Sequence, residues 1–181
     1  MKKIILIAGP SGAGKTTISE YLTKNFAIPR VLTHTTRPKR AGEDENSYYF
    51  ENDETFAQLH FFEHVHYGAY QYGSSQESLD KAWLEHDLVS LIVDIEGVKS
   101  YINRLKDQVY FLYVKTSTIE ELRERLLERG DKPETINQRL SGKELNALPK
   151  ELEPFAHILV NDDWQTTTNW LDQMVQTLTK K

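Results

Sequence analysis

The chain has 181 residues, of which 39% are hydrophobic and 27% are charged, and these values are typical of an ordinary soluble globular domain. Its 22 basic and 27 acidic residues give a net charge of −5, which argues against general binding to nucleic acid. The sequence has no cysteine, which excludes disulfides and suits a reducing cytoplasm, and no apolar run approaches the ~20 residues of a membrane span.

Apolar runs bounded by turn residues predict four buried strands, at residues 4–8, 88–93, 109–114 and 158–160. Apolar residues at helical spacing predict helices at residues 16–26, 77–85, 98–105 and 166–178, and shorter helices that begin near Ser117 and Pro133. Ser117 and Glu120 have the spacing of a capping box, so we expect a helix to start at Ser117. Strands that alternate with helices predict a mainly parallel sheet with helices on both faces.

Residues 33–75 interrupt this alternation with many aromatic and turn-forming residues. We expect short strands around one helix at residues 53–59. This segment therefore predicts a small inserted lobe of mixed α/β structure.

Directly after the first strand, residues 9–17 read GPSGAGKTT, which contains the phosphate-loop pattern GxxxxGK[ST] in full. Glycines allow positive φ, so successive backbone N–H groups can point at an anion, and the next helix adds the partial charge of its N-terminus. We expect Lys15 to reach the β- and γ-phosphates of ATP and the Thr16 hydroxyl to ligate Mg²⁺. The residues expected to bind ATP here are Gly9, Pro10, Ser11, Gly12, Ala13, Gly14, Lys15, Thr16 and Thr17, although the position of Thr17 better suits packing or capping.

An acidic residue usually lies near the magnesium in this chemistry. Asp94 directly follows the apolar run at residues 88–93 and is the natural candidate, with Glu96 as a second. The alternative is that Asp94 caps the helix that follows it.

Two further stretches contain residues suited to binding the molecule that receives the phosphate. Residues 33–43 read THTTRPKRAGE, and residues 62–74 read FEHVHYGAYQYGS. Paired arginines with tyrosines nearby suit a phosphate monoester, although a solvated basic turn is the alternative. The ionised carboxylate of Glu63 only accepts hydrogen bonds, so it fits the adjacent N–H groups of guanine, although it could be an ordinary exposed acid.

Several segments resemble landmarks of the guanylate kinase family, in the family's order, from about residue 4 to 163. These are TTRPKRAGE, the YYF that follows, FE with YGSS downstream, the RG pair at residues 129–130 and VNDD. The resemblance implies an α/β fold of the P-loop NTPase type, with a parallel sheet flanked by helices, an inserted mixed α/β acceptor-binding lobe and a helical lid. It implies one domain over residues 1–181, with a core at 1–32, 76–125 and 144–181, a GMP-binding lobe at 33–75 and a lid at 126–143.

The implied activity is ATP-dependent phosphorylation of GMP, and of dGMP, with Mg²⁺, in the cytoplasm. The resemblance implies no nucleic acid or membrane partner and a monomer or homodimer. Two alternatives remain: a kinase for another nucleoside monophosphate or small phosphate acceptor, and a non-catalytic binding module of similar fold. The intact phosphate loop disfavours the binding module.

The resemblance also implies roles for individual residues. The GMP-binding residues would be Thr33, Arg37, Arg40, Glu43, Tyr49, Glu63, Tyr72, Ser74 and Asp94. Glu43 would hold the arginines in place, and Tyr49 is preferred to Tyr48 because the family tyrosine stands six residues after that glutamate. Arg125, Arg129 and Arg139 would close over the ATP phosphates, and Asn161 would lie toward the adenine. The catalytic residues would be Lys15, Arg37, Arg129 and Arg139.

Two features depart from the family pattern. The strand end that commonly reads Asp-Ile-Asp-x-Gln-Gly has Ile92 in place of the first aspartate and Glu96 in place of the glutamine. Asp94 matches the second aspartate, so the resemblance makes it a GMP ligand rather than a magnesium ligand. The lid reads DKPE after Gly130 and is one residue shorter before Arg139 than the family pattern. These two departures are expected to affect metal binding and turnover.

Overall fold

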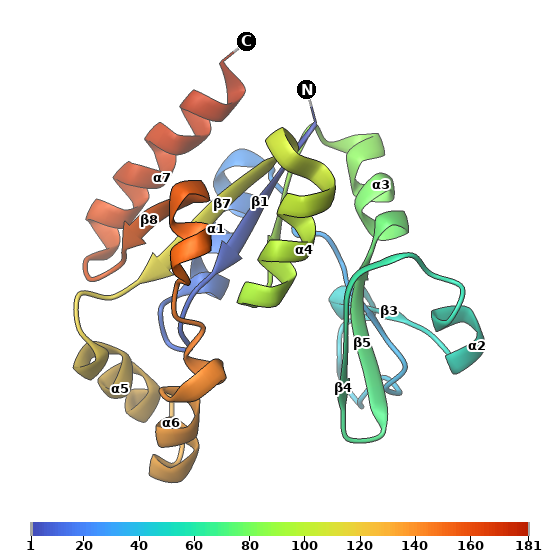
Figure 1. Ribbon diagram of the computed structural model, residues 1–181, viewed down its shortest axis with the longest axis horizontal. Helices are drawn as coiled ribbons and strands as arrows, with labels where there is room; N and C mark the ends of the chain where they lie inside the picture. Colours follow the sequence, from blue (N-terminus) through green and yellow to red (C-terminus); the bar gives the residue numbers. More distant parts are fainter. Residues whose placement is uncertain (1, 181) are drawn as a thin grey trace.

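The computed structural model describes residues 2–180, except for the side chains of residues 143 and 144, and it contains two sheets (Figure 1). The larger sheet is parallel, with the strand order β6–β1–β7–β8. Its strands are β1 (Lys3–Ala8), β6 (Leu88–Ile92), β7 (Val109–Lys115) and β8 (Ala156–Val160). All four strands expected from the apolar runs are therefore confirmed. A short extended segment adds to the β6 edge, where Val31 N–H donates to Ser90 O at 2.8 Å.

Helices cover both faces of this sheet. One face is covered by α1 (Lys15–Phe26) and α7 (Trp164–Thr179), and the other by α3 (Gln76–Glu85) and α4 (Ile95–Leu105). Two further helices, α5 (Ile119–Glu128) and α6 (Pro133–Arg139), lie beyond the ends of the strands (Figure 1). Short 3₁₀ turns complete the core at Lys106–Gln108, Gly142–Leu145 and Lys150–Phe155. Among the described helices, none is long and apolar enough to cross a bilayer.

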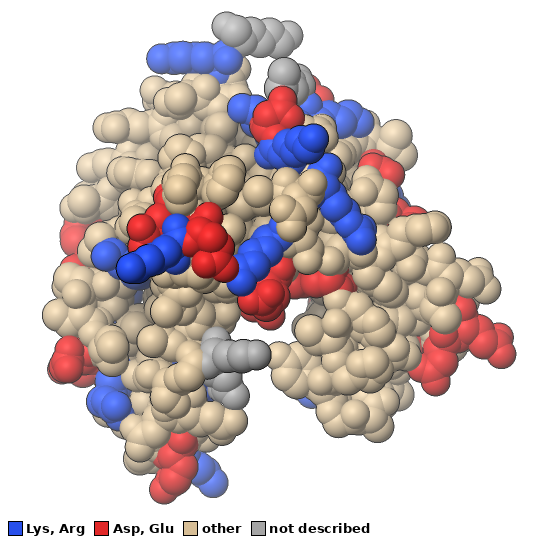
Figure 2. Space-filling view, viewed as in Figure 1, with Lys and Arg blue, Asp and Glu red and all other residues tan. Residues whose placement is uncertain are grey.

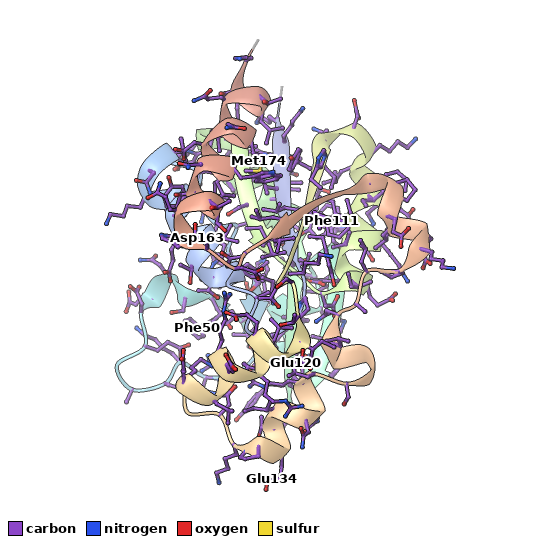
Figure 3. The ribbon with its side chains drawn as sticks, turned by 90° about the vertical axis from the view of Figure 1, so that its left-hand side faces the viewer. Phe50, Phe111, Glu120, Glu134, Asp163 and Met174 are labelled. Carbon is purple, nitrogen blue, oxygen red and sulfur yellow. The ribbon has the colours of Figure 1, made fainter. Side chains whose placement is uncertain are left out.

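Alternate residues of each central strand enter opposite halves of the core, as the two-residue period of a strand requires. Leu6 and Phe111 pack with α3 and α4, whereas Ile7 and Leu112 pack with α1 and α7. Figure 3 shows Met174 under α7 and Phe111 on the other side of the sheet. Burial on both faces explains why the strand sequences are continuous apolar runs.

Residues 34–75 form the second sheet, with the strand order β3–β2–β5–β4. Its strands are β2 (His34–Thr35), β3 (Tyr49–Phe50), β4 (Phe61–Tyr67) and β5 (Tyr70–Ser75), accompanied by a 3₁₀ turn at Glu45–Ser47 and by α2 (Asp53–Phe56). The β2–β3 pair is parallel and the other pairs are antiparallel. His34 ties the sheet together through Glu51 Oε1 at 2.9 Å and Ser75 Oγ at 2.8 Å. Figure 1 places this sheet at the lower right, opposite α5 and α6 at the lower left.

Three expected helix boundaries were wrong. The helix expected at residues 98–105 begins three residues earlier, at Ile95. The residue that caps α5 is Thr118, whose hydroxyl accepts the N–H of Glu121 at 3.2 Å, whereas the N–H of Ser117 donates to Asp162 Oδ1. Thr118 and Glu121 have the same spacing as the predicted capping pair, so the motif was placed one residue early. The helix expected at residues 53–59 ends at Phe56, where the chain turns toward β4.

Candidate active site

The phosphate loop joins β1 to α1, and its glycines adopt backbone conformations that other residues rarely adopt. The φ angles of Gly9, Gly12 and Gly14 are 141°, 86° and 94°. A Cβ atom on Gly9 would lie 1.9 Å from Val114 O, and one on Gly14 would lie 2.3 Å from Asn161 Nδ2. Within the described chain, no side chain caps the first turn of α1, so its N–H groups suit an anion.

Lys15 lies along this loop. Its ammonium donates to Gly9 O at 2.8 Å and to Pro10 O at 2.7 Å. An ammonium has three donors, so these bonds allow another to a phosphate oxygen. Burial, followed by the charge of Arg129, lowers the pKa of Lys15 to about 8. An anion bound beside Lys15 would therefore favour its charged form.

Asn161 braces the loop from behind. Its Nδ2 donates to Ala13 O at 2.8 Å, while its Oδ1 accepts from the Thr167 hydroxyl at 2.8 Å. The side chain is buried, and both ends of its amide are engaged by the protein. Asn161 therefore supports the loop, and its position toward the adenine side stays a prediction. Thr16 and Thr17 are exposed in the first turn of α1.

The arginines of the expected lid do not form one group. Arg129, at the end of α5, and Arg139, at the end of α6, both donate to Asp131 Oδ2, the second at 3.1 Å. Arg125 instead donates to Glu121 Oε1 at 2.9 Å on its own helix. The Asp131 carboxylate thus binds both Arg129 and Arg139, and the charge of Arg129 contributes to the lowered pKa of Lys15.

The sequence analysis missed Asp131, although it directly follows the RG pair. Bonding to Arg129 lowers the pKa of its carboxyl below the ordinary range. Asp131 therefore stays ionised and can keep the two guanidinium groups together. The side chain of Lys143, at the end of the expected lid, lies outside the described residues.

A cleft of about 420 Å³ runs from the phosphate loop to the second sheet. Lys15 lines it from the loop, Ile92 and Asp94 from the end of β6, and Glu63 and Tyr72 from the second sheet. Its other polar lining residues are Thr33, Tyr48, Tyr67 and Asn146, and no sequence motif had marked Asn146. Figure 2 shows the molecule hollowed between its two lower parts, with acidic side chains at the upper end of the hollow.

Glu43 holds Arg37 and Arg40, the two arginines expected to bind the acceptor phosphate. Its carboxylate accepts two bonds from the Arg37 guanidinium, at 2.6 and 3.0 Å, and one from the backbone N–H of Arg40 at 2.9 Å. The bonds from Arg37 lower the pKa of Glu43 to about 2. Arg37 is buried, whereas the Arg40 side chain is exposed. Glu43 thus holds Arg37 by its side chain and Arg40 by its backbone.

The structure brings Tyr48, rather than Tyr49, to the cleft. The Tyr48 ring lies 6.1 Å from that of Tyr72, and the Arg37 guanidinium lies 5.6 Å from its centre. Tyr49 packs 5.0 Å from the ring of His34, with Lys81 Nζ 4.8 Å from its own centre. Adjacent residues of an extended chain point to opposite sides, so the count of six residues from Glu43 selected the wrong neighbour.

Glu63 lies on β4 against α4. Its Oε1 accepts from the Ser74 hydroxyl at 3.3 Å, and a Cβ atom on Gly97 would lie 2.1 Å from its Oε2. Burial, followed by the charge of Asp94, raises the pKa of Glu63 to about 7. Asp94 caps α4, because its Oδ1 accepts the N–H of Gly97 at 2.7 Å, and it also lines the cleft. Capping α4 and lining the cleft are therefore compatible roles for Asp94.

The altered strand end changes the wall of the cleft. Ile92 lines it with an apolar side chain, whereas Glu96 is exposed and forms an ion pair with Lys99 at 3.0 Å. Neither residue brings a carboxylate to the phosphate loop. Among the described residues, no group of three His, Cys, Asp or Glu side chains could hold a metal ion.

Comparison with known proteins points to one family. A family model described as guanylate kinase matches residues 1–178. The chain is 33% identical over 190 residues to the guanylate kinase of Helicobacter pylori, covering 97% of this chain and 87% of that protein. It is 36% identical over 170 residues to that of Clostridium perfringens, covering 88% and 76%. The crystal structure of guanylate kinase from Anaplasma phagocytophilum has a similar fold, with a TM-score of 0.64 at 23% identity over 99% of this chain and 87% of that one, and the predicted fold class is confirmed.

Proposed function

The chain belongs to the guanylate kinase family, which phosphorylates GMP to GDP using ATP, and we propose that it does so in the cleft between the phosphate loop and the second sheet. The observation that carries this proposal is that Lys15 and Glu63 line the same cleft. One is suited to the transferred phosphate and the other to the guanine. The family resemblance drawn from the sequence motifs is confirmed.

On the donor side, we propose that the phosphate loop and Lys15 bind the ATP phosphates. The positive-φ glycines and the uncapped start of α1 would supply backbone N–H groups, and Lys15 would supply a positive charge. Arg129 and Arg139, held together by Asp131, would add positive charge where the γ-phosphate leaves. Arg125 bonds to Glu121 through its Nε and still has N–H donors, so we propose that it adds to the positive charge near the ATP phosphates.

On the acceptor side, we propose that Arg37, Arg40, Tyr48 and Tyr72 bind the phosphate of GMP. Arg37 has five N–H donors, of which three bond to Glu43 and Pro38, so the guanidinium is fixed but still has donors for a phosphate. This preorganisation reduces the loss of side-chain freedom on binding.

For the base, we propose that the ionised carboxylate of Glu63 accepts the N1–H and N2–H of guanine. Ser74 orients this carboxylate, and Thr33 and Asp94 complete the wall around it. Adenine lacks such a pair of adjacent donors. The site would therefore discriminate between purines by leaving a buried carboxylate unpaired with the wrong base.

The phosphate loop also fits a magnesium ion that binds together with ATP. Mg²⁺ prefers oxygen ligands and usually takes one or two from the protein, with phosphate oxygens and water as the rest. The exposed Thr16 hydroxyl beside Lys15 is the ligand that we propose. When bound, Mg²⁺ neutralises negative charge on the phosphates.

The transfer itself asks for placement rather than for a strong base. An oxygen of the GMP phosphate attacks the γ-phosphorus of ATP while the bond to the ADP oxygen breaks. Lys15 and the two lid arginines would stabilise charge on the donor, and Arg37 would hold the attacking group in line. The second sheet lines the cleft, and α5 and α6 lie opposite that sheet (Figure 1), so we propose that these parts close over the bound nucleotides and exclude water.

The proposal is tested by ADP release from ATP with each nucleoside monophosphate in turn. We expect release with GMP and dGMP and little with AMP, CMP or UMP. Equal rates with AMP and GMP would contradict guanine recognition by Glu63. ADP release at the same rate with and without any nucleoside monophosphate would indicate a different activity. We also propose a cytoplasmic location, which the lack of cysteine suits, and a monomer or homodimer.

A further inference from the structure

Tyr101 contains a buried polar atom that the proposed function does not use. The residue lies on α4 with 0% of its surface exposed. Within the described residues, its hydroxyl is the only buried side-chain oxygen or nitrogen without a hydrogen-bond partner. Such a group normally costs stability, and phenylalanine would fill the same space without that cost.

The position of Tyr101 is directly behind the wall that carries Glu63. Gly97 and Tyr101 are four residues apart, so they share one face of α4. Gly97 admits the Glu63 carboxyl, because a Cβ atom there would lie 2.1 Å from Oε2. One turn later, the Tyr101 ring stacks on Phe62, the residue before Glu63, with ring centres 4.0 Å apart and an angle of 17°. The same helical face therefore supports two successive residues of β4.

The polar groups that influence the Tyr101 hydroxyl are Ser74, Glu63 and Arg104. Burial raises the pKa of this hydroxyl well above its ordinary range, so it remains a neutral donor. Ser74 is also fully buried, and its hydroxyl donates to Glu63 Oε1 at 3.3 Å. A serine oxygen that donates still has lone pairs to accept another bond. Ser74 is thus a suitable acceptor between Tyr101 and Glu63.

We propose that Tyr101 is a positioning residue for guanine recognition, whose hydroxyl donates to Ser74 and thereby directs the Ser74 proton at Glu63. This inference rests on the proposed reading of guanine by Glu63. Donors in series strengthen one another, so the chain from Tyr101 through Ser74 favours an ionised and correctly oriented carboxylate. In the described part of this structure the Tyr101 hydroxyl has no hydrogen-bond partner, so the bond to Ser74 is proposed for the protein with GMP bound. Hydrogen bonds at a binding site are often poorly aligned until the substrate is engaged.

The test is Tyr101→Phe in the full chain, which keeps the ring and removes only the hydroxyl. We expect KM for GMP to rise about 3- to 10-fold, which corresponds to the loss of one hydrogen bond. The value of kcat should stay within about twofold of the wild type. Thermal stability should stay equal or increase, because a buried hydroxyl is removed. Tyr110→Phe is the matched control, since it removes the same atom from a tyrosine stacked on His157, 3.9 Å between ring centres.

A double-mutant cycle separates positioning from packing. In a Ser74→Ala background, Tyr101→Phe should leave KM for GMP unchanged, because the group through which it acts is missing. The proposal is overturned if Tyr101→Phe leaves KM unchanged in the wild-type background, or raises it equally in both backgrounds. If the wild-type chain does not use GMP at all, the proposed function itself fails. If the wild-type chain does use GMP, the Tyr101→Phe result tests only the role proposed for Tyr101.

Discussion

Replacing Glu63 with glutamine should stabilise the folded protein above neutral pH while it impairs the use of GMP. Burial and the charge of Asp94 raise the pKa of this carboxyl from its ordinary value of 4.5 to about 7. The folded state therefore keeps a proton up to about pH 7 that the unfolded state releases near pH 4.5. Between these values a rise in pH favours the unfolded state, so wild-type stability falls. Glutamine does not titrate, so the variant avoids this loss.

The size of the effect follows from the same change in pKa. One pKa unit is worth about 1.4 kcal/mol, so a rise from 4.5 to about 7 gives an upper bound of ~3.5 kcal/mol. The carboxyl is partly accessible from the cleft, and water screens part of its interaction with Asp94. We therefore expect the free energy of unfolding of Glu63→Gln to exceed that of the wild type by roughly 1–3 kcal/mol at about pH 8, and by much less near pH 4.5.

Urea denaturation across this pH range measures the difference directly. Glu20→Gln, on the exposed side of α1, is the control for removing a carboxylate as such. In parallel, kcat/KM for GMP should fall by about 1–3 kcal/mol of transition-state binding, because guanine loses a charged acceptor. A stability difference that does not change with pH would refute the assigned burial of the charge. An unchanged nucleobase preference would refute the role in recognition.

Three further variants test the donor half of the cleft. Lys15→Ala should abolish GMP-dependent ADP release with little change in melting temperature, and near-normal turnover would contradict the role of the loop. Ile92→Asp puts a carboxylate beside the loop, so the Mg²⁺ concentration for half-maximal rate should fall by roughly 2- to 10-fold, and an unchanged Mg²⁺ titration would place residue 92 outside the metal's reach. Asp131→Asn should raise KM for ATP by about 3- to 10-fold, because Arg129 and Arg139 lose their common acceptor, whereas a lower KM would mean that Asp131 competes with phosphate.

The phosphate loop could be predicted from the sequence because its determinants are contiguous. Gly9 and Gly14 specify local backbone geometry, and the residues on either side specify a strand and a helix. The bond between Arg37 and Glu43 spans only six residues, and a motif of that length can also be recognised. Interactions between residues that are close in the sequence can therefore be predicted without knowledge of the fold.

The remaining features depend on contacts between distant segments. Asn161 braces Ala13, which is 148 residues away, so its role as a support for the loop depends on the order of strands in the sheet. Tyr101 meets Phe62 only because α4 packs on β4. The choice between Tyr48 and Tyr49 depends on strand register, which one residue reverses completely. Each of these errors or omissions concerns which way a side chain points.

The two ends of the cleft share a property that links their chemistry to the substrates. The protein makes Lys15 easier to deprotonate and Glu63 easier to protonate, so each group is less readily charged than it would be in water. A triphosphate beside Lys15 and the N–H groups of guanine beside Glu63 would each favour the charged form. A bound ligand of opposite character would therefore stabilise the charged form of each group. Such opposed pKa shifts are characteristic of functional sites, because a site built only for stability would have paired these groups with each other or with other side chains.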